Sequence, residues 1–344
     1  MRLGLVGYGL GGRYFHAPFI VAADGVELVG VVTRSPRRRE ELAVDHPGVP
    51  AFDSLAEMLA SGVDAVTITT PPQTRRQLVM DALAGGVHVI ADKPFAPSAQ
   101  AGRDLVRAAE EADRVLNVFH NRRWDADIRT LSAVLARGEI GRLWRAESRF
   151  DLDDPDTLES GPEGGLLRDL GSHLVDQMLW LLGRAGSVYA ELDFVDLPDG
   201  RTDCAFSVMI THEGGVHSHL SSTKLNRIRE RELRAYGSAG SFVSRGSDVQ
   251  AQAVFAGLRP ADLGAGWGYE AEPLWGSLHT ASGAARVPSE QGAYHDYYTR
   301  FAAALRGEGE FPVPAAEAVH VLEVLDAART SAAENRVVEL PAPA

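Results

Sequence analysis

The feature that most constrains the fold of this chain is the sequence GYGLGG at residues 7–12, which follows the apolar run RLGLV at residues 2–6. A strand followed by G-x-G-x-x-G is typical of dinucleotide sites, because glycines let backbone N–H groups approach a pyrophosphate at a helix N-terminus. An ordinary glycine-rich turn is the alternative, since the chain contains 35 glycines. The position after an N-terminal strand favours cofactor binding by Gly7, Gly9, Leu10 and Gly12.

Strand-like and helix-like segments alternate through the first third of the chain. Runs rich in β-branched residues occur at residues 2–7, 26–33, 65–70, 88–91 and 115–120, with helical spacing between them. This order predicts an α/β fold, with a doubly wound parallel sheet forming a Rossmann domain over residues 1–120. A length of 344 residues also favours two domains.

The pattern changes after residue 120. Helical segments at residues 125–141 and 172–182 are followed by alternating runs such as 204–212 and 217–225, which are typical of half-exposed antiparallel strands. We therefore expect residues 121–344 to form an α+β domain with a large open, mainly antiparallel sheet.

The loop after the second predicted strand indicates which cofactor is preferred. An acid there would accept the ribose hydroxyls of NAD and would repel a 2′-phosphate. The chain instead has Thr33, Arg34 and Ser35, with Arg37 or Arg38 nearby. This favours NADP(H) over NAD(H), bound by Thr33, Arg34, Ser35 and Arg38. A solvated basic surface loop is the other interpretation.

A second group of polar residues opens the predicted helix near residue 172. If the helix has begun by Asp169, His173 lies within about 40° of it and Asp176 is almost in line. A carboxylate beside an imidazole can fix the tautomer and raise the basicity of the ring, as a general base requires. The spacing alone favours a structural acid–histidine pair, because such local pairs are common.

The composition of the chain limits its expected binding partners and its expected location in the cell. A net charge of −13 disfavours nucleic acid and anionic membranes. No apolar run reaches the roughly 20 residues that span a bilayer. The single cysteine allows no intrachain disulfide, and no export signal opens the sequence, so we expect a cytoplasmic protein with a small-molecule substrate and no metal.

These motifs together resemble the glucose-fructose oxidoreductase / inositol dehydrogenase / MocA (Gfo/Idh/MocA) family, from Gly7 to Leu340. The family's markers appear here as Thr70-Pro71, Asp92-Lys93-Pro94 and Asp169-x-Gly171-x-His173-x-x-Asp176. The segments FHAPFI, DKPF, VFHNRRWDAD and GSAGSFV further resemble the subgroup that contains NADP-dependent scyllo-inositol dehydrogenases.

The resemblance implies an NADP(H)-dependent dehydrogenase or reductase that acts on a secondary alcohol or ketone of a cyclic polyol or sugar. Lys93 would orient the reacting oxygen and stabilise its developing charge. His173 would donate or accept the proton, and Asp169 would orient it. The resemblance places Thr70, Pro71, Lys93 and Pro94 at the cofactor. It places Lys93, Asn121, Arg123, Trp124, Asp151, Asp169 and His173 at the substrate.

Several residues depart from the family pattern. Asp92 replaces the usual glutamate, and Pro72 and Arg75 stand where the family often has an asparagine and a histidine. Residues 150–161, FDLDDPDTLESG, are acidic where the subgroup is basic, so an amino or otherwise cationic substrate stays open. Trp124 could wall the nicotinamide, stack on a sugar or pack between domains.

Two other function classes share the resemblance. One is a redox-neutral glycoside hydrolase that uses tightly held NAD, which the basic loop at residues 33–38 disfavours. The other is a non-catalytic cofactor sensor, which the intact Lys93, Asp169 and His173 disfavour. The family also implies a homodimer or homotetramer built through one face of the second sheet. Near the end of the chain, Tyr294 and Tyr298 are expected mainly in the core.

Overall fold

The computed structural model describes residues 1–161, 164–246 and 248–341. The chain divides into two compact units and passes from one unit to the other several times along the sequence. The first unit comprises Met1–Asn121, Gln250–Trp267 and Ala293–Ala318; the second comprises Arg122–Val249, Gly268–Gly292 and Val319–Ala344. The first crossing lies near the expected boundary, but the later return segments differ from an uninterrupted second domain.

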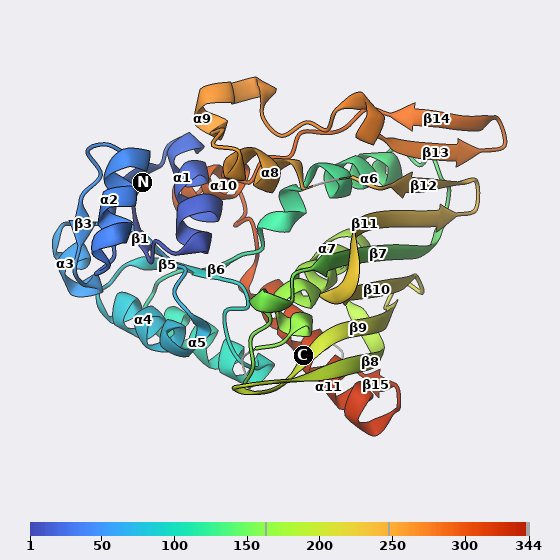
Figure 1. Cartoon of the computed structure of the whole chain (residues 1–344), viewed down its shortest axis with the longest axis horizontal. Coiled ribbons are helices and arrows are strands. Elements are labelled where there is room, and N and C mark those ends of the chain that lie inside the picture. Colours follow the sequence, from blue (N-terminus) through green and yellow to red (C-terminus); the bar gives the residue numbers. More distant parts are fainter. Residues whose placement is uncertain (162–163, 247, 342–344) are drawn as a thin grey trace. The chain divides into compact units, whose positions relative to one another are not determined.

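A six-stranded parallel sheet forms the centre of the first unit, which confirms the predicted Rossmann fold (Figure 1). Its strand order is β3-β2-β1-β4-β5-β6. The strands are β1 (Arg2–Val6), β2 (Glu27–Val32), β3 (Ala51–Phe52), β4 (Ala65–Ile68), β5 (His88–Asp92) and β6 (Leu116–Phe119). Every residue of β4 and β6 is buried, as expected for parallel strands covered on both faces. The two-residue β3 is too short to leave a sequence pattern.

Helices connect these parallel strands, as right-handed crossovers require. They are η1 (Gly11–His16), α1 (Ala17–Ala22), α2 (Pro36–Asp45), α3 (Leu55–Ala60), α4 (Pro72–Ala84) and α5 (Ala99–Glu111). The later segments add α8 (Val249–Phe255), α9 (Pro260–Leu263), η5 (Gly264–Gly266) and α10 (His295–Leu305). Serines cap α2, α3 and α5, where the Ser35, Ser54 and Ser98 hydroxyls each accept a backbone N–H of the first turn.

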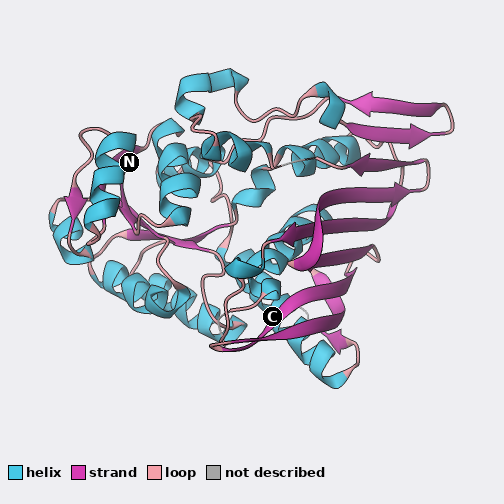
Figure 2. Ribbon diagram, in the orientation of Figure 1, coloured by secondary structure: helices cyan, strands magenta, loops and turns pink. Residues whose placement is uncertain are grey.

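A nine-stranded mixed sheet dominates the second unit (Figure 2). Its order is β14-β13-β12-β11-β7-β10-β9-β8-β15, and only the β7–β10 pair is parallel. The strands are β7 (Leu143–Asp153), β8 (Ala185–Leu197), β9 (Gly200–His212), β10 (His217–Thr223), β11 (Leu225–Gly237), β12 (Gly240–Ser244), β13 (Gly276–Thr280), β14 (Gly283–Val287) and β15 (Val338–Glu339). The predicted large, mainly antiparallel sheet is confirmed.

Helices of the second unit cover one face of this sheet, and none of its described helices covers the other face (Figure 2). They include α6 (Ala126–Ala136), η3 (Pro155–Thr157), η4 (Leu167–Gly171), α7 (Ser172–Leu182), η6 (Glu272–Leu274) and most of η2 (Asn121–Trp124) and of α11 (Ala315–Glu334). From Phe206 to His212, buried and exposed residues alternate strictly along β9, which gives one apolar face and one polar face. Among the described residues, no helix is both long and apolar enough to cross a membrane.

Candidate active site

The glycine turn after β1 forms an open backbone cradle in the first unit. Gly7 has φ +105°, and its N–H donates to the Val32 carbonyl at the end of β2. A Cβ on Gly12 would lie 2.2 Å from the Gly7 carbonyl oxygen, so a side chain there would force the turn apart. A Cβ on Gly9 would meet nothing within 4 Å, and Leu10 beside it is exposed. Space beside the backbone at Gly9 is therefore open, which is the feature for which the sequence predicts a cofactor turn.

The arginines of the loop between β2 and α2 differ in whether they are paired with an acid. The Arg38 guanidinium pairs with Glu41 at 2.6 Å, and the Ser35 hydroxyl accepts the Arg38 N–H. Arg34 is exposed and has no hydrogen-bond or ion-pair partner within the part of the chain that is described. Thr33 donates its N–H to the Phe52 carbonyl, which fixes the loop against β3. Of these two arginines, Arg38 is thus held by an acid and Arg34 is not.

The turn that carries Lys93 follows β5 on the same sheet edge. The Asp92 Oδ1 atom accepts the Lys93 N–H at 2.8 Å, and the Lys93–Pro94 peptide bond is cis. Arg75 of α4 donates to the Thr70 carbonyl at 2.8 Å and to the Pro94 carbonyl at 2.5 Å. The buried Arg75 therefore ties together the two loops that the sequence placed at the cofactor. The sequence analysis identified Arg75 as a departure from the family pattern, but it did not predict that Arg75 would bridge these two loops.

Asp92 is the centre of a hydrogen-bonded cluster in the first unit. Its Oδ2 atom accepts the Thr69 hydroxyl at 2.8 Å and lies 3.3 Å from the His16 Nε2 atom. The other ring nitrogen of His16 lies 2.6 Å from the Tyr298 hydroxyl. Burial alone would raise the pKa of Asp92, but the charge and hydrogen bond of His16 and nearby cations lower it overall. The shortened acid is therefore held as a carboxylate under the Lys93 turn.

The acids of the second unit do not share one partner. Asp169 lies in η4, a π-helical turn, and His173 is the second residue of α7. The ideal helical phase used in the prediction does not hold through a π-turn. Lys224 binds Asp169 at 2.9 Å, whereas Arg123 binds the buried Asp176. The helix at residues 172–182 is confirmed, but the charged partners of its acids come from distant segments.

Arg123 sits in the short helix η2 and is buried with its neighbour Trp124. Its Nε and Nη2 atoms donate to the two carboxylate oxygens of Asp176 at 3.0 and 2.6 Å. This bidentate pair fixes α7 to η2 within the second unit. Asn121, which ends the first unit's opening segment, is also buried. Arg123 thus holds the helix that carries His173.

The acidic segment at residues 150–161 is linked to a residue that the sequence analysis missed. Asp151 is buried, its Oδ1 atom accepts the Thr223 N–H at 3.1 Å, and burial raises the pKa of its carboxyl group. The next residue, Lys224, donates to Asp169 at 2.9 Å and to the Thr157 carbonyl at 3.3 Å. A lysine at the end of a polar strand is an ordinary surface pattern, so little in the sequence could have identified it.

The strand order and the glycine turn define the class of this protein. An open parallel sheet in this order binds ligands where the strand order reverses, here between β1 and β4. The glycine turn, the loop after β2 and the Lys93 turn all follow carboxyl ends of strands in this sheet. The first unit therefore has the fold of a dinucleotide-binding Rossmann domain.

Comparisons with known proteins identify the family. Residues 1–120 match the family described as "Oxidoreductase family, NAD-binding Rossmann fold", and residues 128–243 match the "GFO/IDH/MocA C-terminal domain". The uncharacterized oxidoreductase YdgJ of Escherichia coli is 34% identical over 95% of this chain and 94% of its own length. The chain belongs to the Gfo/Idh/MocA oxidoreductase family.

Two further relatives cover nearly the whole chain. The scyllo-inositol 2-dehydrogenase (NADP(+)) IolW of Bacillus subtilis is 29% identical over 99% of this chain and 96% of its own length. The solved structure of yvaA from Bacillus subtilis has a TM-score of 0.90 and 30% identity, and covers 99% of this chain and 98% of that chain. The family includes NAD(P)-dependent dehydrogenases.

Proposed function

We propose that this protein is an NADP(H)-dependent oxidoreductase that acts on a secondary alcohol or ketone of an uncharged cyclic polyol or sugar. The observation that carries the proposal is the position of Lys93, at a strand end on the sheet edge that also presents the glycine turn. Bound NADP(H) would supply or accept the hydride. Gly7, Gly9, Leu10 and Gly12 would hold its pyrophosphate, and Arg34 with Thr33 its 2′-phosphate.

Three side chains would carry out the remaining chemistry. The Lys93 ammonium would donate to the reacting oxygen and stabilise the negative charge that develops there. His173 would take the alcohol proton during oxidation, or return it during reduction, and Asp169 would keep the ring in the productive orientation. This division is supported by Asp92 and Arg75, which fix the Lys93 turn, and by Arg123, which fixes α7.

The cofactor and substrate assignments rest on separate arguments. The unpaired Arg34 supports NADP(H), as does the name of the relative IolW. Carboxylates such as Asp151 and Asp169 can accept hydrogen bonds from several hydroxyl groups, which supports a polyhydroxylated substrate. Asn121 and Trp124 would complete the substrate contacts. The redox-neutral hydrolase and the cofactor sensor have no observation that favours them over this function.

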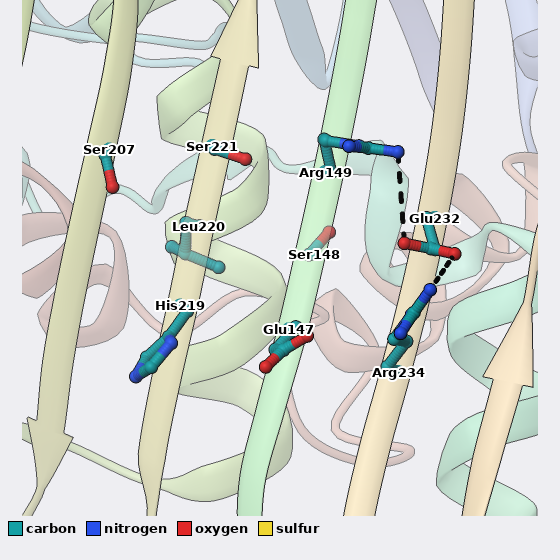
Figure 3. Close-up of a pocket in the computed structure, with 9 residues that line it drawn as sticks. All are labelled: Glu147, Ser148, Arg149, Ser207, His219, Leu220, Ser221, Glu232 and Arg234. Carbon is teal, nitrogen blue, oxygen red and sulfur yellow. Dashed lines mark hydrogen bonds and ion pairs between the residues drawn. The ribbon is translucent and has the colours of Figure 1, made fainter.

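We also propose that the protein is a homodimer or homotetramer joined through the polar face of the nine-stranded sheet. Side chains of β7, β9, β10 and β11 line a hollow of about 320 Å³ on this face (Figure 3). Glu232 there binds both Arg149 and Arg234. Carboxylates and guanidinium groups side by side can face one another across a two-fold axis. Light scattering that gives a monomer mass at micromolar concentration would refute this assembly.

A substrate screen tests the proposed reaction. The purified protein is mixed with NADP+ and, one at a time, inositols, aldoses and matched amino sugars, and reduced cofactor is followed by its absorbance. Turnover of an uncharged polyol or sugar in wild type, and its loss in Lys93→Ala and His173→Asn, is the expected result. Equal turnover in wild type and both variants would show that the activity arises elsewhere.

A further inference from the structure

Lys224 is a buried ammonium group that the proposed reaction does not yet use. It follows β10 at the turn into β11, and its side chain is 4% exposed. Its partner Asp169 is 46% exposed at the side chain. Burying an ammonium is strongly unfavourable unless it is paired, so a lysine kept at this position requires a compensating interaction. The Nζ atom lies 2.9 Å from the Asp169 Oδ2 atom and 3.3 Å from the Thr157 carbonyl oxygen.

The backbone holds Lys224 from both sides. Its N–H donates to the Cys204 carbonyl of β9 at 3.1 Å, and its carbonyl accepts the Asp154 N–H at 3.2 Å. The preceding Thr223 N–H donates to the Asp151 carboxylate. The ammonium position is therefore set by neighbouring strands and by the acidic segment, not by a freely moving side chain.

The surroundings of Lys224 are strongly acidic. Residues 151–159 contain five acids and no basic residue, and Asp169 adds another carboxylate. The side chain of Lys224 reaches the carbonyl of Thr157 in the middle of this segment. Arg149 also lies 3.6 Å from Asp151, but its side chain is 40% exposed and it binds Glu230 as well. Lys224 is thus the buried cation among these acids in the described part of the chain.

We propose that Lys224 is a positioning and specificity-determining residue. It fixes the Asp169 carboxylate, and its charge offsets the acids so that the site favours uncharged polyols or sugars over amine-bearing analogues. The inference rests on the proposed function, because it assigns a role in that same reaction. Residues 150–161 contain no lysine or arginine, and Lys224 of the β10–β11 turn places a positive charge beside them.

The experiment compares one uncharged substrate from the screen with the analogue in which a hydroxyl is replaced by an ammonium group. Lys224→Met should lower kcat/KM for the uncharged substrate roughly tenfold to a hundredfold, the scale of losing a hydrogen bond to a charged group. The ratio of kcat/KM for the amine to that for the uncharged substrate should rise at least about tenfold, because the acids are no longer offset. NADP(H) affinity, measured by calorimetry, should stay within about twofold.

Matched variants separate charge from structure. Lys224→Arg keeps the charge and should keep the wild-type ratio, whereas Lys224→Gln keeps a hydrogen-bond donor and should shift the ratio as Met does. Arg184→Met removes an equal charge from the pair with Glu213, elsewhere in the same unit, and should not shift it. Because the ratio compares two substrates on one sample, reduced stability or a lower folded fraction cancels.

The outcomes are distinct. An unchanged ratio in Lys224→Met and Lys224→Gln overturns this inference and leaves the proposed function standing. A wild-type preference for the amine overturns this inference together with the uncharged substrate class, and leaves the oxidoreductase activity itself standing. A wild-type protein that turns over none of the compounds overturns the proposed function, and the inference with it.

Discussion

The two units hold their candidate site residues by different means. In the first unit, the Lys93 turn is fixed mainly through backbone groups: the Lys93 N–H and the carbonyls of Thr70 and Pro94. In the second unit, Asp169 and Asp176 are fixed by charged side chains 55 and 53 residues away in sequence. Contacts to backbone groups survive most side-chain changes, whereas a charged pair is lost when either of its partners is replaced.

The largest expected effect tests the charged frame of the second unit. Arg123→Met should lower the free energy of unfolding by about 3–5 kcal/mol, because Asp176 would stay buried without its guanidinium. Thr69→Val, which removes a hydroxyl hydrogen bond to the Asp92 carboxylate in the first unit, should cost less, about 1.5–3 kcal/mol. Urea unfolding of both variants measures the difference.

A double variant is the control for the charged frame. Replacing Arg123 by Met and Asp176 by Leu removes both charges, so it should recover most of the stability lost in Arg123→Met. Equal destabilisation by Arg123→Met and Thr69→Val would contradict the contrast between the two frames.

The next largest effect is expected on catalysis by Lys93, whose turn is fixed through backbone groups. Lys93→Ala should lower kcat by a factor on the order of 10² to 10³, because it removes a preorganised charge at the reacting oxygen. NADP(H) affinity should be nearly unchanged, since the glycine turn and Arg34 are intact. Measuring kcat, cofactor affinity and melting temperature on one sample separates this role from a structural one. An active but unstable variant would show that Lys93 is structural.

His173→Asn is the matched variant in the second unit. It should lower kcat to a similar extent and remove the limb of the pH profile that reports the histidine, provided that proton transfer limits the rate. An unchanged pH profile with normal kcat would assign the proton transfer to another group.

A smaller effect tests how the first unit selects its cofactor. Thr33→Asp combined with Arg34→Gln should weaken NADP binding relative to NAD by about 2 kcal/mol, because a cation is lost and a repelling carboxylate is gained. Glu41→Gln is a second variant for comparison with this double variant, because it releases Arg38 from its ion pair. Calorimetry in which wild type binds NAD at least as tightly as NADP would contradict the role given to Arg34.

The first unit could be predicted from the sequence more fully than the second. The glycine turn, the strand ends and the family motif around Lys93 are contiguous patterns, because a parallel sheet brings successive strand ends to one edge. The later return of residues 250–267 and 293–318 to this unit has no comparable local pattern. The helix at residues 172–182 could also be predicted, because its apolar periodicity is local.

The partners of the second unit's acids could not be predicted. Lys224 and Arg123 reach Asp169 and Asp176 only after the strands and helices have packed, and no spacing rule connects them. The ideal helical geometry assumed between Asp169 and His173 was also wrong in detail, because η4 is a π-turn. Side-chain pairs distant in sequence are therefore the part of the site that needs the structure.

The smallest effect concerns four histidines, two in each unit, whose pKa values are lowered by burial. Burial lowers the pKa of His46 and His88 in the first unit and of His212 and His320 in the second. In the second unit, the backbone N–H of Ala185 donates to the His320 Nε2 atom at 3.1 Å, which requires that nitrogen to be unprotonated. The folded protein thus binds fewer protons at these rings than the unfolded chain does.

Stability should therefore fall as the pH decreases through and below about 6.5, the ordinary histidine value, towards the lowered folded-state values. The sign follows because the unfolded chain takes up protons that the folded rings resist. Urea unfolding near pH 7.5 and near pH 5.5 measures the slope. His212→Gln should flatten it more than His88→Gln, because His212 is the more deeply buried ring. A wild-type protein equally stable at both pH values, or a slope unchanged in His212→Gln, would show that these rings do not control the pH dependence of folding.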